Sequence, residues 1–223
     1  MILGTRMAQD IQDEGPITKV NLGRLTNTIF VFTLLLLFGN IWVPTFNSDD
    51  MVSPDVLAMK LLPDIMNFLI VFIIIAMIWI TAYHTFHMVA RIDRTYLYLH
   101  LGILMMLVLL PISSHYTEIF ATKSVFPVLF HSLMLVLGTL LFCEWYHISC
   151  KHSVLRAGIA GWRRWCITVK MLIIPVTAVV GIVLAACDLP STQYIYLGAM
   201  AAFFIMSLYS AKNLKKSPGV LHD

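Results

Sequence analysis

Charged residues are scarce in this sequence. Only 12% of its 223 residues are Asp, Glu, Lys or Arg, whereas 59% are hydrophobic. A soluble domain has about 25% charged residues, so this chain has too little charge to cover a water-exposed surface. The composition disfavours a soluble enzyme, a disordered regulator and a nucleic-acid-binding protein. It indicates an integral membrane protein.

Cysteine is also sparse, and the motifs of nucleotide-driven or covalent chemistry are missing. Four cysteines lie at Cys143, Cys150, Cys166 and Cys187. They have neither the density nor the spacing of a disulfide framework or a zinc site. No phosphate-binding loop, nucleotide fingerprint or nucleophile motif is present in the sequence. We therefore expect no catalytic residue, no metal site and no enzyme activity.

Long apolar runs fill most of the chain. A helix needs ~20 mainly apolar residues to cross the hydrocarbon core of a membrane, and six segments meet this requirement. They lie at about residues 25–46, 61–84, 96–113, 125–148, 167–187 and 194–211. The sequence predicts an all-α, polytopic membrane protein with six transmembrane helices. We expect one domain over residues 1–223, with polar cytoplasmic tails at 1–20 and 212–223.

The basic residues are distributed unevenly between the loops. If the N-terminus is cytoplasmic, every Lys and Arg except Lys60 and Lys123 lies on the cytoplasmic side, which is 13 of the 15. Cytoplasmic loops of membrane proteins carry such an excess of Lys and Arg. We therefore predict that both termini are cytoplasmic.

One face of the first predicted helix has a regular pattern. Its members are Thr28, Phe32, Leu35 and Gly39, spaced by 4, 3 and 4 residues. This spacing places them on the same side of a helix. Packing against a neighbouring helix explains the pattern, with Gly39 allowing close approach. Alternatively, the face lines a pore, in which a hydrophobic ring forms a constriction that gates by dewetting.

Several histidines lie near the ends of predicted helices, where interfacial hydrogen bonds account for them. His84, His100 and His147 all fall near the predicted cytoplasmic side. Two histidines facing each other on separate helices can hold a haem. A haem-binding membrane redox protein is therefore one alternative.

Two further charged features lie near the predicted inner interface. Glu144 is expected to meet a basic residue there, either Lys151 or Lys170. Residues 161–165, Gly-Trp-Arg-Arg-Trp, are typical of an interfacial anchor with its indoles at headgroup level. Binding of an anionic lipid is the alternative interpretation of this segment.

Residues that carry a family resemblance lie between about 19 and 115. The first helix contains Leu25-Thr26-Asn27-Thr28-Ile29-Phe30-Val31-Phe32 and then Leu35-Leu36-Leu37. The next two contain Trp79, Phe86, Arg91-Ile92-Asp93-Arg94, His100 and Leu109-Leu110-Pro111. This series resembles the prokaryotic branch of the transmembrane protein 175 potassium channels. Members of that family have Arg-x-x-x-Phe-Ser-Asp in the first helix, then Trp-x-x-His-His, a basic stretch ending in Asp-Arg, and Leu-Leu-Pro.

The chain departs from the family pattern at its polar positions. The Phe-Ser-Asp motif is Leu25-Thr26-Asn27 here, and the family's preceding Arg is replaced by Asn21, with Arg24 one turn closer. The paired histidines of the family align with Ala82-Tyr83. The family's Asn on the third helix aligns with His100. In the family these groups resemble an interhelical hydrogen-bond network. The resemblance implies that the corresponding network here consists of Arg24, Asn27, Trp79, Tyr83 and His100.

The resemblance also implies an assembly and a function. It implies a homotetramer with the four first helices around a central pore that has no carbonyl filter loop. The pore-lining residues are then Thr28, Phe32, Leu35 and Gly39, with Phe32 and Leu35 as the hydrophobic constriction. The expected function is a potassium-permeable channel of the cell (plasma) membrane, with permeant K⁺ ions and no cofactor.

The expected partners of such a channel are further copies of the chain, membrane lipids and monovalent cations, with no nucleic acid. Two alternatives remain open from the sequence. The first is a non-conducting relative that acts as a membrane scaffold or sensor. The second is the haem-binding redox protein suggested by the histidines.

Overall fold

The computed structural model describes residues 19–40, 54–120, 125–150, 161–189 and 192–216, and these ranges are almost entirely helical. The elements are α2 (Lys19–Gly39), α3 (Pro54–Met88), α4 (Arg94–Ile119), α5 (Val125–Cys150), α6 (Gly161–Ala186), the short 3₁₀ helix η1 (Thr192–Tyr194) and α7 (Ile195–Lys216). All six α-helices in these ranges are long and apolar enough to cross a membrane. The prediction of an all-helical chain with six candidate membrane spans is confirmed.

The helix boundaries differ from the predicted ones at both ends of the described chain. Of the described helices, the first begins at Lys19 and the last continues to Lys216, because polar residues remain helical beyond an apolar core. Residues 41–46 of the first predicted span lie outside the described residues, as do residues 1–18 and 217–223 of the predicted tails.

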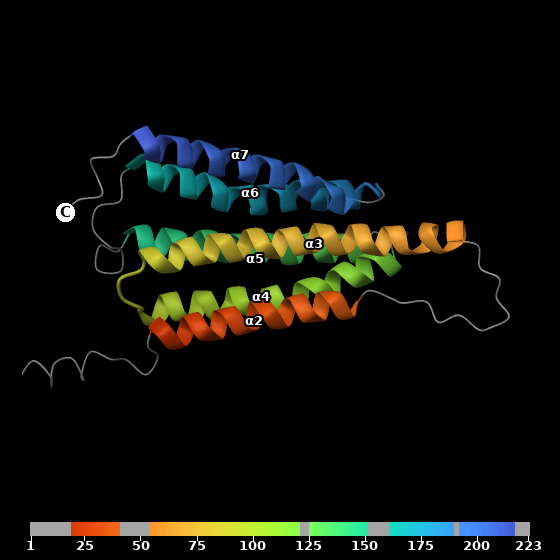
Figure 1. The fold of residues 1–223 in the computed structure, drawn as a ribbon, viewed down its shortest axis with the longest axis horizontal. Helices are drawn as coiled ribbons and strands as arrows, with labels where there is room; N and C mark the ends of the chain where they lie inside the picture. Colours follow the sequence, from red (N-terminus) through yellow and green to blue (C-terminus); the bar gives the residue numbers. More distant parts are fainter. Residues whose placement is uncertain (1–18, 41–53, 121–124, 151–160, 190–191, 217–223) are drawn as a thin grey trace, which may run out of the picture.

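The six helices lie side by side along the long axis of the molecule (Figure 1). Helix α5 is central in the packing, because its most extensive contacts are with α6 on one side and α4 on the other. Helix α2 packs against α4 and α3, whereas α7 packs against α6 and α3. Figure 1 shows α2 and α7 at opposite edges of the bundle.

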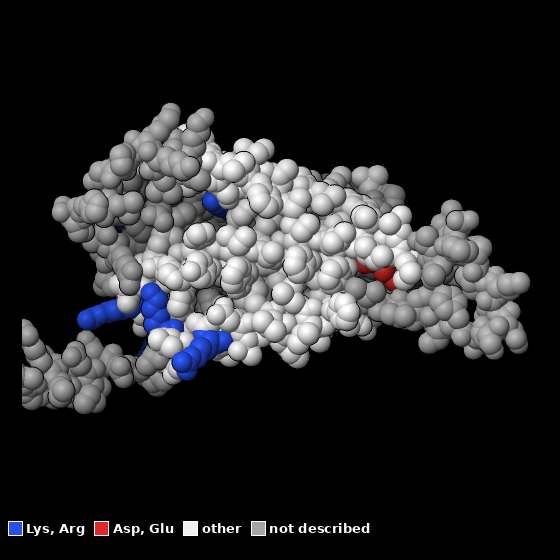
Figure 2. Space-filling view, viewed as in Figure 1, with Lys and Arg blue, Asp and Glu red and all other residues white. Residues whose placement is uncertain are grey.

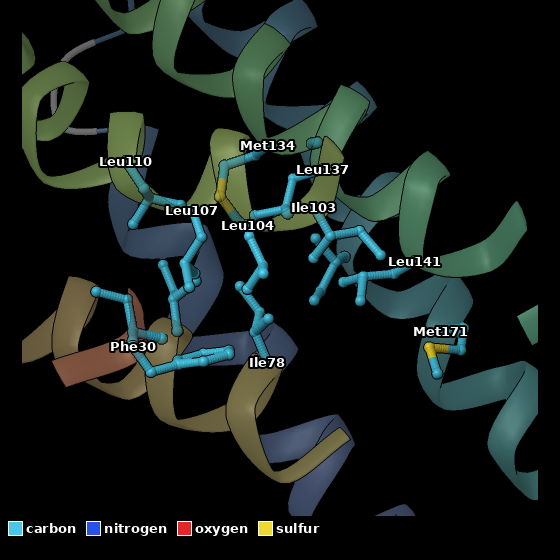
Figure 3. Close-up of a cluster of buried hydrophobic side chains, with 14 of the residues drawn as sticks. Phe30, Ile78, Ile103, Leu104, Leu107, Leu110, Met134, Leu137, Leu141 and Met171 are labelled. Carbon is cyan, nitrogen blue, oxygen red and sulfur yellow. The ribbon is translucent and has the colours of Figure 1, made fainter. Parts of the chain in front are cut away.

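The core is a continuous cluster of buried, mainly large aliphatic and aromatic side chains from all six described α-helices, with Tyr196 and Ala199 contributed by α7. Figure 3 shows part of it, in which α2 contributes Phe30, α3 contributes Ile78, α4 contributes Ile103, Leu104, Leu107 and Leu110, α5 contributes Met134, Leu137 and Leu141, and α6 contributes Met171. Lipid tails are as apolar as these side chains, so helix association in a membrane depends on close packing and interhelical hydrogen bonds.

Helices α5 and α6 approach each other closely at two glycines. A Cβ atom added to Gly138 would lie 2.7 Å from Cδ of Pro175, and one added to Gly181 would clash with the ring of His131 at Nδ1. His131 is completely buried and bonds to the hydroxyl oxygen of Thr192 at 2.8 Å. Small residues allow the backbones of neighbouring membrane helices to approach in this way.

Candidate pore-lining face and its polar supports

Helix α2 has one face packed against its own subunit and another that is uncovered. The packed face consists of Leu22, Thr26, Phe30, Thr33 and Leu37. These residues recur every three or four positions, which is the period of one helical face. The hydroxyl of Thr33 donates to the Ile29 carbonyl at 2.8 Å, so its buried polar group is satisfied within the helix.

The four predicted pore-lining residues lie on the uncovered face. The Phe32 side chain is 51% exposed and that of Leu35 is 63% exposed. Thr28 is also exposed, and its hydroxyl donates to the Arg24 carbonyl at 2.9 Å. A Cβ atom added to Gly39 would have no neighbour within 4 Å. Close packing within the subunit, the other interpretation of this face, is therefore absent from the described residues.

The structure brings some members of the predicted polar network together. The Trp79 indole N–H donates to the side-chain oxygen of Asn27 at 3.4 Å, which links α3 to the exposed side of α2. The Tyr83 ring lies 5.7 Å from the Trp79 ring, measured between centroids. Arg24 is exposed. Its backbone carbonyl accepts a hydrogen bond from the Thr28 hydroxyl. Among the described residues, no side-chain hydrogen bond joins Arg24 to the other members of the predicted network.

His100 has different partners, which lie inside the bundle. Its Nε2 is 2.8 Å from the Thr26 hydroxyl oxygen on α2, and its Nδ1 is 2.7 Å from Oε1 of Glu144 on α5. His100 and Glu144 are each only 1% exposed. The buried Tyr96 also interacts with the Glu144 carboxylate, and its ring is stacked on that of His100.

The hydrogen-bond donors in this cluster can be assigned from its geometry. The Thr26 hydroxyl donates to the Leu22 carbonyl at 2.8 Å, so its oxygen is left to accept from Nε2 of His100. Nδ1 is then the ring nitrogen that bonds to Oε1 of Glu144. Ionisable side chains at membrane depth are tolerated when they are paired with one another in this manner. The cluster therefore fixes α2 to α4 and α5.

The position of Glu144 corrects the expectation from the sequence. Glu144 faces His100 on α4 and not Lys170, which lies in a separate groove lined by α3, α6 and α7. Lys151 lies outside the described residues. Sequence reasoning missed the pair because nothing in the order of residues indicates which faces of α4 and α5 meet.

A second polar contact joins α4 and α5 near one end of the bundle. Asp93 is the N-cap of α4 and accepts a hydrogen bond from the Tyr96 backbone N–H at 2.8 Å. Its other carboxylate oxygen lies 2.8 Å from Nε2 of His147 on α5. Asp93 thus satisfies a free N–H group at the start of α4 while also contacting the last turns of α5.

The histidine contacts bear on the haem alternative. Both ring nitrogens of His100 have side-chain partners, and so do both ring nitrogens of His131. An axial ligand needs one ring nitrogen for the iron. Either histidine would have to lose a buried contact to bind haem. Within the described ranges, no group of three or more His, Cys, Asp or Glu side chains is arranged to hold a metal ion.

These features define a multi-pass, all-helical membrane protein whose first described helix has one uncovered face. Residues 21–111, from α2 into α4, match the model of the family described as the endosomal/lysosomal potassium channel TMEM175. This confirms the family resemblance inferred from the sequence. The family is one of ion channels and not a class of enzymes.

The fold also matches a solved structure. The crystal structure of a lysosomal potassium-selective channel TMEM175 homologue from Chamaesiphon minutus aligns with a TM-score of 0.66 at 19% sequence identity. The alignment covers 86% of this chain and 97% of that one. None of the curated proteins compared with the chain matches it. The chain therefore shares the fold of this homologue over most of its length.

Proposed function

We propose that this protein is a potassium-permeable channel in which four copies surround a central pore lined by α2. The family match over residues 21–111 supports this function, because the matched family is described as a potassium channel. The observation that carries the proposal is the uncovered face of α2. More than half of the Phe32 and Leu35 side-chain surface is exposed, although both lie within a candidate membrane span.

The polar residues beside this face favour a pore over a lipid-facing surface. Lipid would accommodate Phe32 and Leu35 equally well, so their exposure alone does not distinguish the two. Asn27 and Thr28 are exposed on the same helix, however, and Arg24 lies one turn before Thr28. Polar groups at membrane depth usually face a water path or a protein interior. A central axis gives all of these residues a suitable environment.

The proposed pore would control ion flow with apolar rings. Four copies of Phe32 and Leu35 around the axis would form a hydrophobic constriction, which gates by excluding water. The Thr28 hydroxyl already donates to Arg24 in its own helix, so its oxygen is available to accept hydrogen bonds from water in the pore. The permeant ion is K⁺ and no cofactor takes part.

The distribution of charge supports an orientation in the membrane. Figure 2 shows basic residues at the end of the bundle where α2 begins and acidic residues toward the opposite end. The described basic residues at that end include Lys19, Arg24, Arg91 and Arg94. Because cytoplasmic surfaces carry the excess of Lys and Arg, we assign this end and both termini to the cytoplasm. The corresponding location is the plasma membrane.

Flux measurements test the proposal. Purified protein in lipid vesicles is expected to show K⁺ flux that exceeds Na⁺ flux. Phe32→Ala is expected to raise or alter the flux, because it removes the bulkiest member of the constriction. Phe38→Ala is the matched control: it makes the same change at another exposed position of α2, about 120° away around the helix.

The second candidate function is a non-conducting relative with the same fold. The bulk of Phe32 and the neutral Asn27, at the position of the family's Asp, favour this candidate. It predicts tetramers with no flux in the wild-type protein or in Phe32→Ala. Folded, tetrameric samples of both proteins without any K⁺ flux would disprove the channel function.

A further inference from the structure

A second distinctive feature lies on the side of the bundle away from α2. Helices α3, α6 and α7 line an open groove of about 670 Å³. This volume is within the range of about 300–1,000 Å³ that is typical of ligand sites. Helix α7 packs only lightly against α3 compared with its contact with α6, so the groove follows the α3–α7 boundary.

The groove is polar at one end and apolar along its depth. Ile73 and Met77 of α3 and Met200 of α7 line the part farther from the basic end of the bundle. His84 of α3 and Ser207 of α7 lie two to three turns nearer to that end. This gradient of polarity along the membrane normal is that of a phospholipid, with its headgroup toward water and its tails toward the bilayer centre.

Lys170 of α6 supplies a positive charge inside this groove. It is six residues beyond Arg164, the start of the candidate span, which is a rise of about 9 Å into the membrane. Its ammonium group lies 5.4 Å from the centroid of the Phe203 ring. Among the described residues no carboxylate forms an ion pair with the Lys170 ammonium group. The Glu144 carboxylate, which the sequence suggested as its partner, pairs with His100 instead.

The occupant of the groove follows from its position and charge. If α2 surrounds the central axis, as the proposed function requires, α7 lies at the periphery of the assembly because it is at the opposite edge of the bundle (Figure 1). The groove then opens to the bilayer and not to another subunit. Basic pockets between membrane helices on the cytoplasmic side bind anionic lipid headgroups.

We propose that the groove between α3, α6 and α7 binds one anionic phospholipid of the cytoplasmic leaflet, with the lipid phosphate at Lys170 and an acyl chain against Met77 and Met200. The Ser207 hydroxyl, at the polar end of the groove, donates a hydrogen bond to the headgroup. The orientation of the site rests on the proposed function, whereas the chemistry of the groove does not.

Native mass spectrometry of the purified protein tests this site. The probes are phosphatidylglycerol and phosphatidylcholine with identical acyl chains, added to delipidated protein in detergent. The wild-type protein is expected to retain phosphatidylglycerol preferentially. Lys170→Gln is expected to weaken phosphatidylglycerol binding roughly fivefold or more, which corresponds to the attraction of one Lys for an anionic surface. Binding of phosphatidylcholine is expected to stay the same.

Two further variants separate the parts of the site. Ala76→Phe fills the groove with an aromatic ring and is expected to weaken binding of both lipids, because Ala76 is one of the lining residues. Arg94→Gln is the matched control, since it removes an exposed positive charge at the same end of the bundle but outside the groove. It is expected to bind phosphatidylglycerol like the wild type.

The possible results are distinct. Equal binding of the two lipids by the wild type, or unchanged phosphatidylglycerol binding by Lys170→Gln, would overturn the proposal. A cross-link from the exposed Phe204 in the groove to another copy of the chain would also overturn it, in favour of a subunit interface. The same spectra report the oligomeric state, and flux is measured separately. Failure of lipid binding is therefore distinguishable from failure of the channel function.

Discussion

Nδ1 of His100 lies 2.7 Å from Oε1 of Glu144, and the two side chains are 1% and 2% exposed. The residues are 44 positions apart in the chain and join α4 to α5. Thr26 of α2 bonds to the other nitrogen of the same imidazole. The position of α2, the proposed pore helix, therefore depends on the His100–Glu144 pair, whose members lie on α4 and α5.

The first prediction concerns the charge of this pair. Glu144→Gln removes the carboxylate and leaves His100 with a neutral partner in a buried site. Breaking a buried ion pair on one side costs about 3–5 kcal/mol. We expect a loss of this order in the free energy of unfolding, measured by denaturation in detergent micelles.

Replacing both partners provides the control. The double variant His100→Leu with Glu144→Leu removes both charges and is expected to be more stable than Glu144→Gln, because apolar pairs often substitute for buried ion pairs without loss. If the double variant is less stable than Glu144→Gln, breaking the His100–Glu144 pair is not the cause of the loss in the free energy of unfolding.

The second prediction compares two threonines of α2 that are two residues apart. Thr26→Val removes the oxygen that contacts His100, and a membrane hydrogen bond contributes about 0.6 kcal/mol on average. We expect a loss of at least this size in the free energy of unfolding. Thr28→Val has nearly the same shape change on the exposed face, so it is expected to leave the stability unchanged and to alter K⁺ flux. Equal destabilisation by both variants would contradict this assignment of the two faces.

The sequence predicts the helices well and their contacts poorly. Runs such as Phe68–Ile80 have no other stable arrangement in a membrane than a helix, so the six spans follow from composition and length. The uncovered face of α2 also follows from local information, because Phe32 and Leu35 are related only by helical periodicity. Both features depend on residues that are close together in the chain.

The buried pair and the lipid groove depend on tertiary packing. His100 and Glu144 meet because the packing of α4 against α5 brings the two buried side chains together. Lys170 was an equally reasonable partner for Glu144 from the sequence, since both residues lie toward the same end of the bundle. Which of two partners a buried charge meets is decided by helix rotation, and no local pattern encodes this rotation.

The third prediction tests the close approach of α5 and α6. Gly138→Ala places a Cβ atom 2.7 Å from Cδ and 2.8 Å from the backbone nitrogen of Pro175. The proline nitrogen belongs to the α6 backbone, so the helices must separate. Overpacking of this type costs about 1–3 kcal/mol, and we expect that loss in the free energy of unfolding.

Another glycine of the bundle gives the matched control for this effect. A Cβ atom at Gly102 meets only the flexible Leu140 side chain, at 3.5 Å. Gly102→Ala is therefore expected to be neutral or to stabilise the protein by up to about 1 kcal/mol through the higher helix propensity of alanine. A similar loss in both variants would mean that the α5–α6 approach is not specially close.

The last prediction concerns the polarity of the proposed constriction. Leu35→Thr replaces one apolar ring by four hydroxyl groups, which lowers the free-energy cost of water in the narrowest part of the pore. Leu35 is 63% exposed, so little packing within the subunit is lost. We expect K⁺ flux into vesicles to rise while the tetramer stays intact. Leu36→Thr makes the same change about 100° further around the helix and is expected to leave the flux unchanged. If Leu36→Thr raises the flux and Leu35→Thr does not, the pore axis lies on another face of α2, and the assignment of Phe32 to the constriction fails with it.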